Sequence, residues 1–264
     1  MILVGLWLCP SVSWGLDSGS RSLFDKPLLE KHVPLPRDPD NPQTKPMLSC
    51  FYYPRFMVKQ VDLGEEGAEQ LSILPQLSKD HGQPPCLRAN AKDEVLIDSK
   101  TWSGYFEGVK GNFVFFVADD GVEGGLSFAV FSGSYGSKIF EDAAISDGRE
   151  TAFTEMVAFD DSKAASESAI KFSYRRVYVA QCSLRIDEKN CWSRIKQITG
   201  LTETSPPNCS ASYATLEKKY PNDVKAFETG ASVITYDVEA VLDSRNSAVR
   251  ITPVSKVIGC YPAD

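Results

Sequence analysis

The chain has 264 residues, which is enough for one large domain or two small ones with a sizeable hydrophobic core. Its hydrophobic content of 42% and charged content of 24% are those of an ordinary globular protein. The net charge of −7 argues against a nucleic-acid-binding protein, because phosphate recognition depends on clustered lysine and arginine.

Residues 1–15 carry no charge and have the order of a secretory signal peptide. The apolar run at 2–8 is followed by Pro10 and by small residues, as in a cleavage region. No basic residue precedes the run, and a buried N-terminal strand is the alternative interpretation. No later stretch approaches the roughly 18 apolar residues that a transmembrane helix needs. We therefore predict a secreted or periplasmic protein without a transmembrane segment.

Residues 16–49 are rich in proline and in charge. Proline fixes φ and lacks a backbone donor, so such a segment cannot maintain a helix or a strand ladder for long. We predict an extended, poorly ordered lead segment, or one that wraps over the surface. A single β-rich domain is predicted to follow at residues 50–264.

The predicted domain is mainly β from its first residues onward. Residues 50–63 are aromatic and β-branched, with alternating character. Residues 104–142 give the clearest pattern, because glycine and aspartate clusters at regular spacing separate four strands. The predicted turns lie at 110–112, 119–125 and 133–137. Further strands are predicted at 151–159, 169–181, 232–242, 247–252 and 254–260.

Residues 188–220 interrupt this pattern with a predicted helical hairpin. Asp187 is a suitable N-cap for a helix that ends at Gly200, and a proline pair then leads into a second helix that ends before Pro221. One apolar face of the first helix is predicted to pack on the sheet. Its residues are Trp192, Ile195 and Ile198.

These elements together predict a mainly β fold of the α+β class. The predicted architecture is an antiparallel sheet or sandwich with a helical hairpin insert near 188–220, stabilised by disulfides.

Removal of a signal peptide would take Cys9 with it and leave six cysteines, an even number that predicts up to three disulfides in an exported chain. No CxxC motif occurs, and the only histidines, His32 and His81, have no ligand-like spacing to the cysteines. Cys182 and Cys191 are the preferred pair, because a bridge there would tie a strand end to the start of a helix.

The other four cysteines leave several pairings open. Cys50 and Cys260 lie in similar sequence settings near the two ends of the ordered chain, and we predict them as the second pair. Cys86 and Cys209 then follow by elimination. Pairing of Cys191 with Cys209 is the main alternative, since both lie near predicted helix starts.

Asp119, Asp120 and Glu123 surround glycines in one predicted turn. Carboxylate oxygens on a flexible turn can bind Ca²⁺. Their spacing fits neither the EF-hand loop nor the glycine-rich calcium nonapeptide, and a solvated hairpin turn explains the same residues. We predict no metal site, with this turn as the one calcium candidate.

No catalytic motif is recognisable in the sequence. GxSxG and the phosphate-binding loop are absent, so neither a serine hydrolase nor a nucleotide-binding enzyme is indicated. Paired carboxylates could hydrolyse a glycosidic bond if two of them converged. The candidate acids are Glu141, Asp142, Asp147, Glu150 and Glu155, and nothing in the sequence shows that any two of them converge.

Aromatic residues are dense on the predicted strands. Most are expected in the core, while Trp102, Tyr105 and Tyr135 are the candidates for an exposed patch that binds a glycan or a protein partner. The preferred prediction is an exported, non-enzymatic binding protein of unknown ligand, without a cofactor. The alternatives are a carboxylate-based glycan hydrolase and a structural envelope protein.

Overall fold

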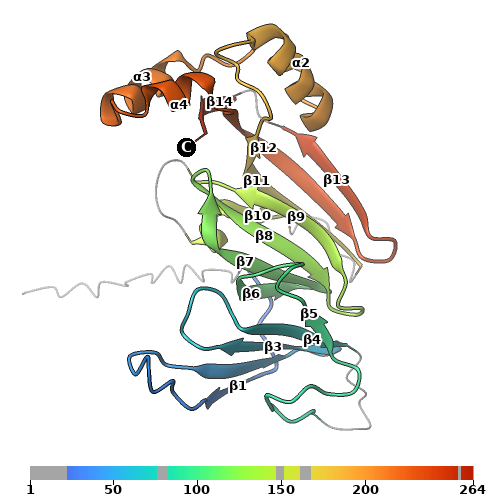
Figure 1. Ribbon diagram of the computed structural model, residues 1–264. Coiled ribbons are helices and arrows are strands. Elements are labelled where there is room, and N and C mark those ends of the chain that lie inside the picture. The colour runs from blue at the N-terminus through green and yellow to red at the C-terminus, as the bar shows by residue number, and fades with distance from the viewer. Residues whose placement is uncertain (1–22, 76–82, 147–151, 161–167, 255–256, 264) are drawn as a thin grey trace, which may run out of the picture.

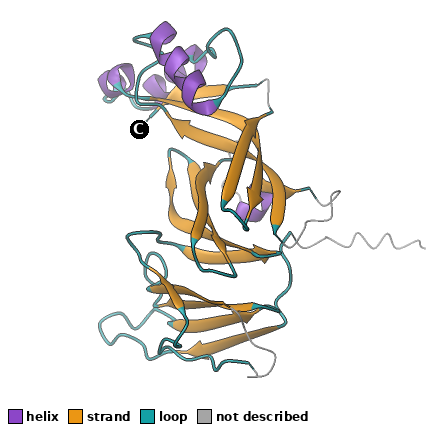
Figure 2. Ribbon diagram, turned by 90° about the vertical axis from the view of Figure 1, so that its right-hand side faces the viewer, coloured by secondary structure: helices purple, strands orange, loops and turns teal. Residues whose placement is uncertain are grey.

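The computed structural model describes residues 23–75, 83–146, 152–160, 168–254 and 257–263. Antiparallel strands dominate these residues, and a group of helices lies at one end of the molecule (Figures 1 and 2). The predicted mainly β, antiparallel fold is confirmed. None of the helices described is both long and apolar enough to cross a membrane.

A five-stranded antiparallel sheet forms the lower tier in Figure 1. Its spatial order follows the chain: β1 (Leu29–Pro34), β2 (Met47–Tyr52), β3 (Phe56–Asp62), β4 (Gln70–Pro75) and β5 (Val95–Ile97). Consecutive strands are therefore neighbours throughout, as in a β-meander.

Strand β1 shows that the prediction of a poorly ordered lead segment at 16–49 was wrong for part of that range. Residues 29–34 pair with β2 along their whole length. Prolines are tolerated because Pro34 ends the strand and β1 lies at the sheet edge, where a missing donor breaks no ladder. Packing begins earlier still, since the Phe24 ring lies 5.4 Å from the Phe115 ring.

The second sheet has nine strands, in the order β13-β12-β11-β9-β8-β7-β6, with β10 beside β11 and β14 beside β12. The strands are β6 (Tyr105–Lys110), β7 (Phe113–Val122), β8 (Gly125–Ser132), β9 (Lys138–Ala144), β10 (Val157–Phe159), β11 (Ala169–Val179), β12 (Ser232–Asp243), β13 (Ala248–Pro253) and β14 (Gly259–Pro262).

The four strands β6 to β9 confirm the pattern predicted for 104–142, with one difference. Strand β7 continues to Val122, so the turn shrinks from 119–125 to Glu123 and Gly124. Both turn residues have positive φ, 48° and 75°, as a tight two-residue hairpin requires. The predicted strand at 151–159 instead contains a short helix, α1 (Phe153–Met156), ahead of β10.

Two hydrophobic cores share strand β7. Successive residues of a strand face opposite sides, so Phe116 points toward the five-stranded sheet and packs with Phe131, their ring centroids 5.3 Å apart. Phe115 points the other way, toward Phe172 of β11 at 5.7 Å. The core that contains Phe116 has residues from both sheets and joins the two sheets into one sandwich.

Helices α2 (Glu188–Thr199), α3 (Ser210–Lys219) and α4 (Val224–Thr229) connect β11 to β12 and form the cap seen at the top of Figure 1. The side chain of Asp187 caps α2, and Gly200 ends it in the left-handed conformation, as predicted. Trp192 and Ile195 are buried, but Ile198 is 67% exposed. Each three-residue step falls about 60° short of a full helical turn, which carries Ile198 off the packed face.

Candidate functional site

Two of the three disulfides among the described residues lie in the helical cap. Cys182 and Cys191 are bonded as predicted and join the loop just after β11 to the first turn of α2. Cys209 and Cys260 join the residue before α3 to strand β14. The cap is therefore tied to the sheet at two separate points.

The third disulfide links Cys50 to Cys86, so the predicted pairs Cys50–Cys260 and Cys86–Cys209 are wrong. Cys50 lies on β2 of the five-stranded sheet, whereas Cys260 lies on β14 of the other sheet. A disulfide forms only between two cysteines whose Cα atoms lie within about 7 Å of each other in the folded chain. The alternative pair Cys191–Cys209 is also excluded, since each bonds elsewhere.

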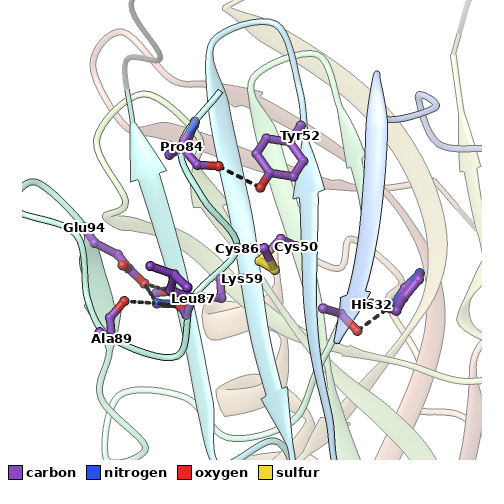
Figure 3. Close-up of a disulfide and its surroundings, with 11 residues drawn as sticks. His32, Cys50, Tyr52, Lys59, Pro84, Cys86, Leu87, Ala89 and Glu94 are labelled. Atoms are coloured by element: carbon purple, nitrogen blue, oxygen red, sulfur yellow. Dashed lines mark hydrogen bonds and ion pairs between the residues drawn. A yellow bond between two sulfur atoms is a disulfide. The ribbon is translucent and has the colours of Figure 1, made fainter. Parts of the chain in front are cut away.

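The Cys50–Cys86 bridge and a buried ion pair hold residues 86–94 on the outer face of the lower sheet (Figure 3). Lys59 Nζ lies 2.6 Å from Glu94 Oε1, with side chains only 2% and 1% exposed. Lys59 also donates to the carbonyls of Leu87 and Ala89, each at 3.3 Å. Its three donors are thus all used, so Lys59 is a structural anchor.

The three aromatic residues proposed for a surface patch do not form one. Trp102 is only 7% exposed and packs in the core between the sheets, so its predicted surface position was wrong. Tyr105 is half-buried and donates its hydroxyl hydrogen to the Glu65 carbonyl at 2.8 Å. Tyr135 is 65% exposed. Strand alternation puts aromatic residues on both faces of β7, and a hydrophobic core covers each of these faces.

The calcium candidate is not assembled in the structure. Asp119 and Asp120 are exposed on strand β7, and Glu123 lies in the hairpin turn. Within the described ranges, no three His, Cys, Asp or Glu side chains gather in a metal-binding group. The Glu123 carbonyl accepts a hydrogen bond from Tyr261 at 2.6 Å, which ties this turn to β14.

Asp142 is a buried acid at the contact between β9 and β11. Its side chain is 6% exposed and accepts hydrogen bonds from Tyr174 at 2.5 Å and Arg176 at 2.9 Å. Burial raises its pKa, and these two partners counter the shift only in part. Arg176 also donates to the Tyr236 hydroxyl at 3.2 Å. The network fills the space where β9 and β11, paired only at Arg176 and Ala144, diverge.

The remaining predicted acids are not brought into a catalytic pair by any contact of the described residues. Glu141 pairs with Lys138 at 2.7 Å, and Glu155 lies in the first turn of α1. Asp147 and Glu150 lie outside the described residues. The glycan hydrolase therefore stays a prediction.

A cavity of about 600 Å³ lies in the helical cap, and we call it the cap pocket. It is lined by the loop between β11 and α2, the start of α2, the Pro206–Pro207 turn and the first two turns of α3. Cys209 lines it, so the disulfide to β14 is part of its wall.

The base of the cap pocket is held by one buried serine. Leu184 and Tyr213 line the pocket and are only 4% and 3% exposed. Ser232, fully buried at the start of β12, accepts a hydrogen bond from the Leu184 backbone at 2.8 Å and contacts the Tyr213 hydroxyl at 3.1 Å. The pocket base is thus anchored directly to the sheet.

Three charged side chains belong to the lining of the cap pocket. Arg185 forms an ion pair with Glu217, and the guanidinium carbon lies 5.3 Å from the centre of the Tyr213 ring. Glu188 is the third charged residue, so the lining has one negative charge in excess. The loop behind the pocket is fixed where Trp192 Nε1 donates to the Glu203 carbonyl at 3.2 Å.

Sequence reasoning located the helices and the proline pair of this region but not the pocket. Its lining comes from segments on either side of α2, and no motif links them. No family model, curated protein or solved structure matches the chain.

Proposed function

We propose that the chain is an exported, non-enzymatic binding protein, secreted or periplasmic, that holds a small molecule in the cap pocket. The observation that carries this proposal is the cavity itself. Its volume of about 600 Å³ lies within the range of small-molecule sites, about 300–1,000 Å³. A purely structural envelope protein needs no such cavity, and a glycan hydrolase needs two free facing carboxylates.

Export is supported by the cysteine chemistry. The described cysteines form three disulfides, and stable disulfides are typical of oxidising compartments. Two of these bridges hold the cap against the sheet, which keeps the pocket formed before a ligand arrives. A preformed pocket binds without the entropy cost of ordering its walls.

The binding test is a ¹H–¹⁵N NMR screen against a defined panel of amines, amino acids, short peptides, monosaccharides and disaccharides. Ala214 lines the pocket on α3, so Ala214→Trp fills it, while Ala211→Trp places the same ring on the same helix away from the lining. We expect panel compounds to shift the pocket amides in the wild type and in Ala211→Trp, but not in Ala214→Trp. A panel that leaves the pocket amides unmoved in the wild type overturns the proposal.

Export is tested separately by the intact mass of the protein after alkylation of free thiols, with and without reduction. We expect the first fifteen or so residues to be missing and no cysteine to be alkylated without reduction. A full-length mass with alkylated cysteines contradicts export.

A further inference from the structure

We infer that the cap pocket selects ligands that carry a primary ammonium group on an apolar body, with Glu188 as the recognition carboxylate. This inference rests on the proposed function, because it assigns a ligand class to the same pocket.

The charge balance of the lining carries the first step. Arg185 and Glu217 neutralise each other in their ion pair, and the guanidinium group also lies over the Tyr213 ring. Glu188 lines the same pocket and forms no ion pair with any described residue. An anionic ligand would therefore meet a carboxylate with no compensating charge, whereas an ammonium group would pair with it.

The amide group of Asn208 does not compete for this role. Asn208 lies at the pocket and uses its side-chain oxygen to accept a hydrogen bond from the Ser210 backbone at 3.0 Å. Its amide hydrogens are donors and cannot bind an ammonium group, and its oxygen carries no net charge that could form an ion pair with one. Glu188 is thus the carboxylate of the lining that forms no ion pair within the described residues.

The apolar part of the lining carries the second step. Leu184, Pro206, Pro207 and Ala214 present carbon surface to the same cavity. A hydrocarbon body removed from water against such a surface gains roughly 25 cal/mol per Å² of buried apolar area. A fully hydrophilic cation would leave this surface unused, so the best ligand combines an ammonium group with an aryl or alkyl body.

The test compares 2-phenylethylamine with 2-phenylethanol, which has the same body and no charge at pH 7. Binding of each compound is measured by NMR titration of the pocket amides at low ionic strength. We expect the amine to bind about five-fold more tightly, the size expected for one solvent-accessible ion pair. The preference should shrink in 0.5 M salt, because accessible charges are screened.

Three variants test whether the charge of Glu188 causes the preference for the amine. Glu188→Gln should abolish the preference for the amine, and Glu188→Asp should retain part of it. Asp223→Asn removes the same charge from the cap outside the pocket lining and should leave the preference unchanged.

Equal affinities in the wild type, or a preference that survives Glu188→Gln, would overturn the ammonium assignment. In that case, loss of binding of both compounds in the Ala214→Trp variant would still support the cap pocket as a small-molecule site. If neither compound shifts the pocket amides, the assignment fails, and the wider panel decides the proposed function independently.

Discussion

Tyr174 donates a hydrogen bond to Asp142 over 2.5 Å, and this contact joins two strands that otherwise pair at a single position. The carboxylate is almost completely buried and also accepts from Arg176. A buried carboxylate is stable only while its acceptor capacity is used. The network thus holds β9 against β11 where the ladder between them ends.

Replacement of Tyr174 by Phe should lower the free energy of unfolding by about 1–3 kcal/mol, since it removes one of the hydrogen-bond donors to a buried charged acceptor. Tyr236→Phe is the matched control, because it removes a hydroxyl that contacts Arg176 at 3.2 Å and does not contact Asp142 directly. Urea unfolding measures both. Equal losses in the two variants would contradict the assigned role of the Asp142 contact.

Asp243 should titrate below the usual range of an aspartate. Hydrogen bonds from the side chain and backbone of Arg245 lower its pKa from 3.8 to about 2. A lowered folded-state pKa means that its stabilising contribution is complete above pH 3.8 and is lost as the pH falls toward 2. A ¹³C titration of the carboxyl resonance should show this value, and Arg245→Gln should return it toward 3.8. An unchanged pKa in that variant would rule out Arg245 as the cause.

The two cap disulfides should differ in their contribution to stability. Cys209–Cys260 closes 51 residues and Cys182–Cys191 closes 9. Chain-entropy arguments then give losses of about 4 and about 3 kcal/mol for the paired alanine variants. Urea unfolding measures the difference. A non-reducing peptide map provides the control, and a fragment that links Cys50 with Cys260 would contradict the connectivity.

Breaking the buried Lys59–Glu94 pair from one side should be costly. Lys59→Met leaves Glu94 buried without its cation, for an expected loss of about 3–5 kcal/mol. The double variant Lys59→Met/Glu94→Leu removes both charges and should lose clearly less than the sum of the two single changes. Thermal or urea unfolding of the four proteins gives this coupling, and strictly additive losses would argue against a direct pair.

Local signals predicted the elements that depend on neighbours in the chain. The four strands at 104–142 follow from alternation interrupted by glycine and aspartate, and α2 follows from its caps at Asp187 and Gly200. Strands β1 and β5 gave no such signal, because β1 has proline at one end and β5 has only three residues. Both strands form because a neighbouring strand provides partners for their backbone hydrogen bonds.

The disulfides show the same difference between pairings set by neighbours in the chain and pairings set by the tertiary structure. Cys182 and Cys191 are nine residues apart on two consecutive elements, so sequence alone favoured their bridge. The partner of Cys50 depends on which loop crosses the outer face of the lower sheet. The similar sequence settings of Cys50 and Cys260 carried no information about how far apart the two residues lie in the folded chain. The Cys50–Cys260 prediction failed for this reason.

By itself, the sequence determined a mainly β chain with a helical insert and enough cysteines for three bridges. Those properties follow from local periodicity, capping and residue counts. Only the tertiary structure decided that Trp102 is buried and that Leu184 and Tyr213 meet at the base of a pocket. Burial and cavities depend on which distant segments pack together, and in this chain Ser232 brings the two pocket segments to one point of the sheet.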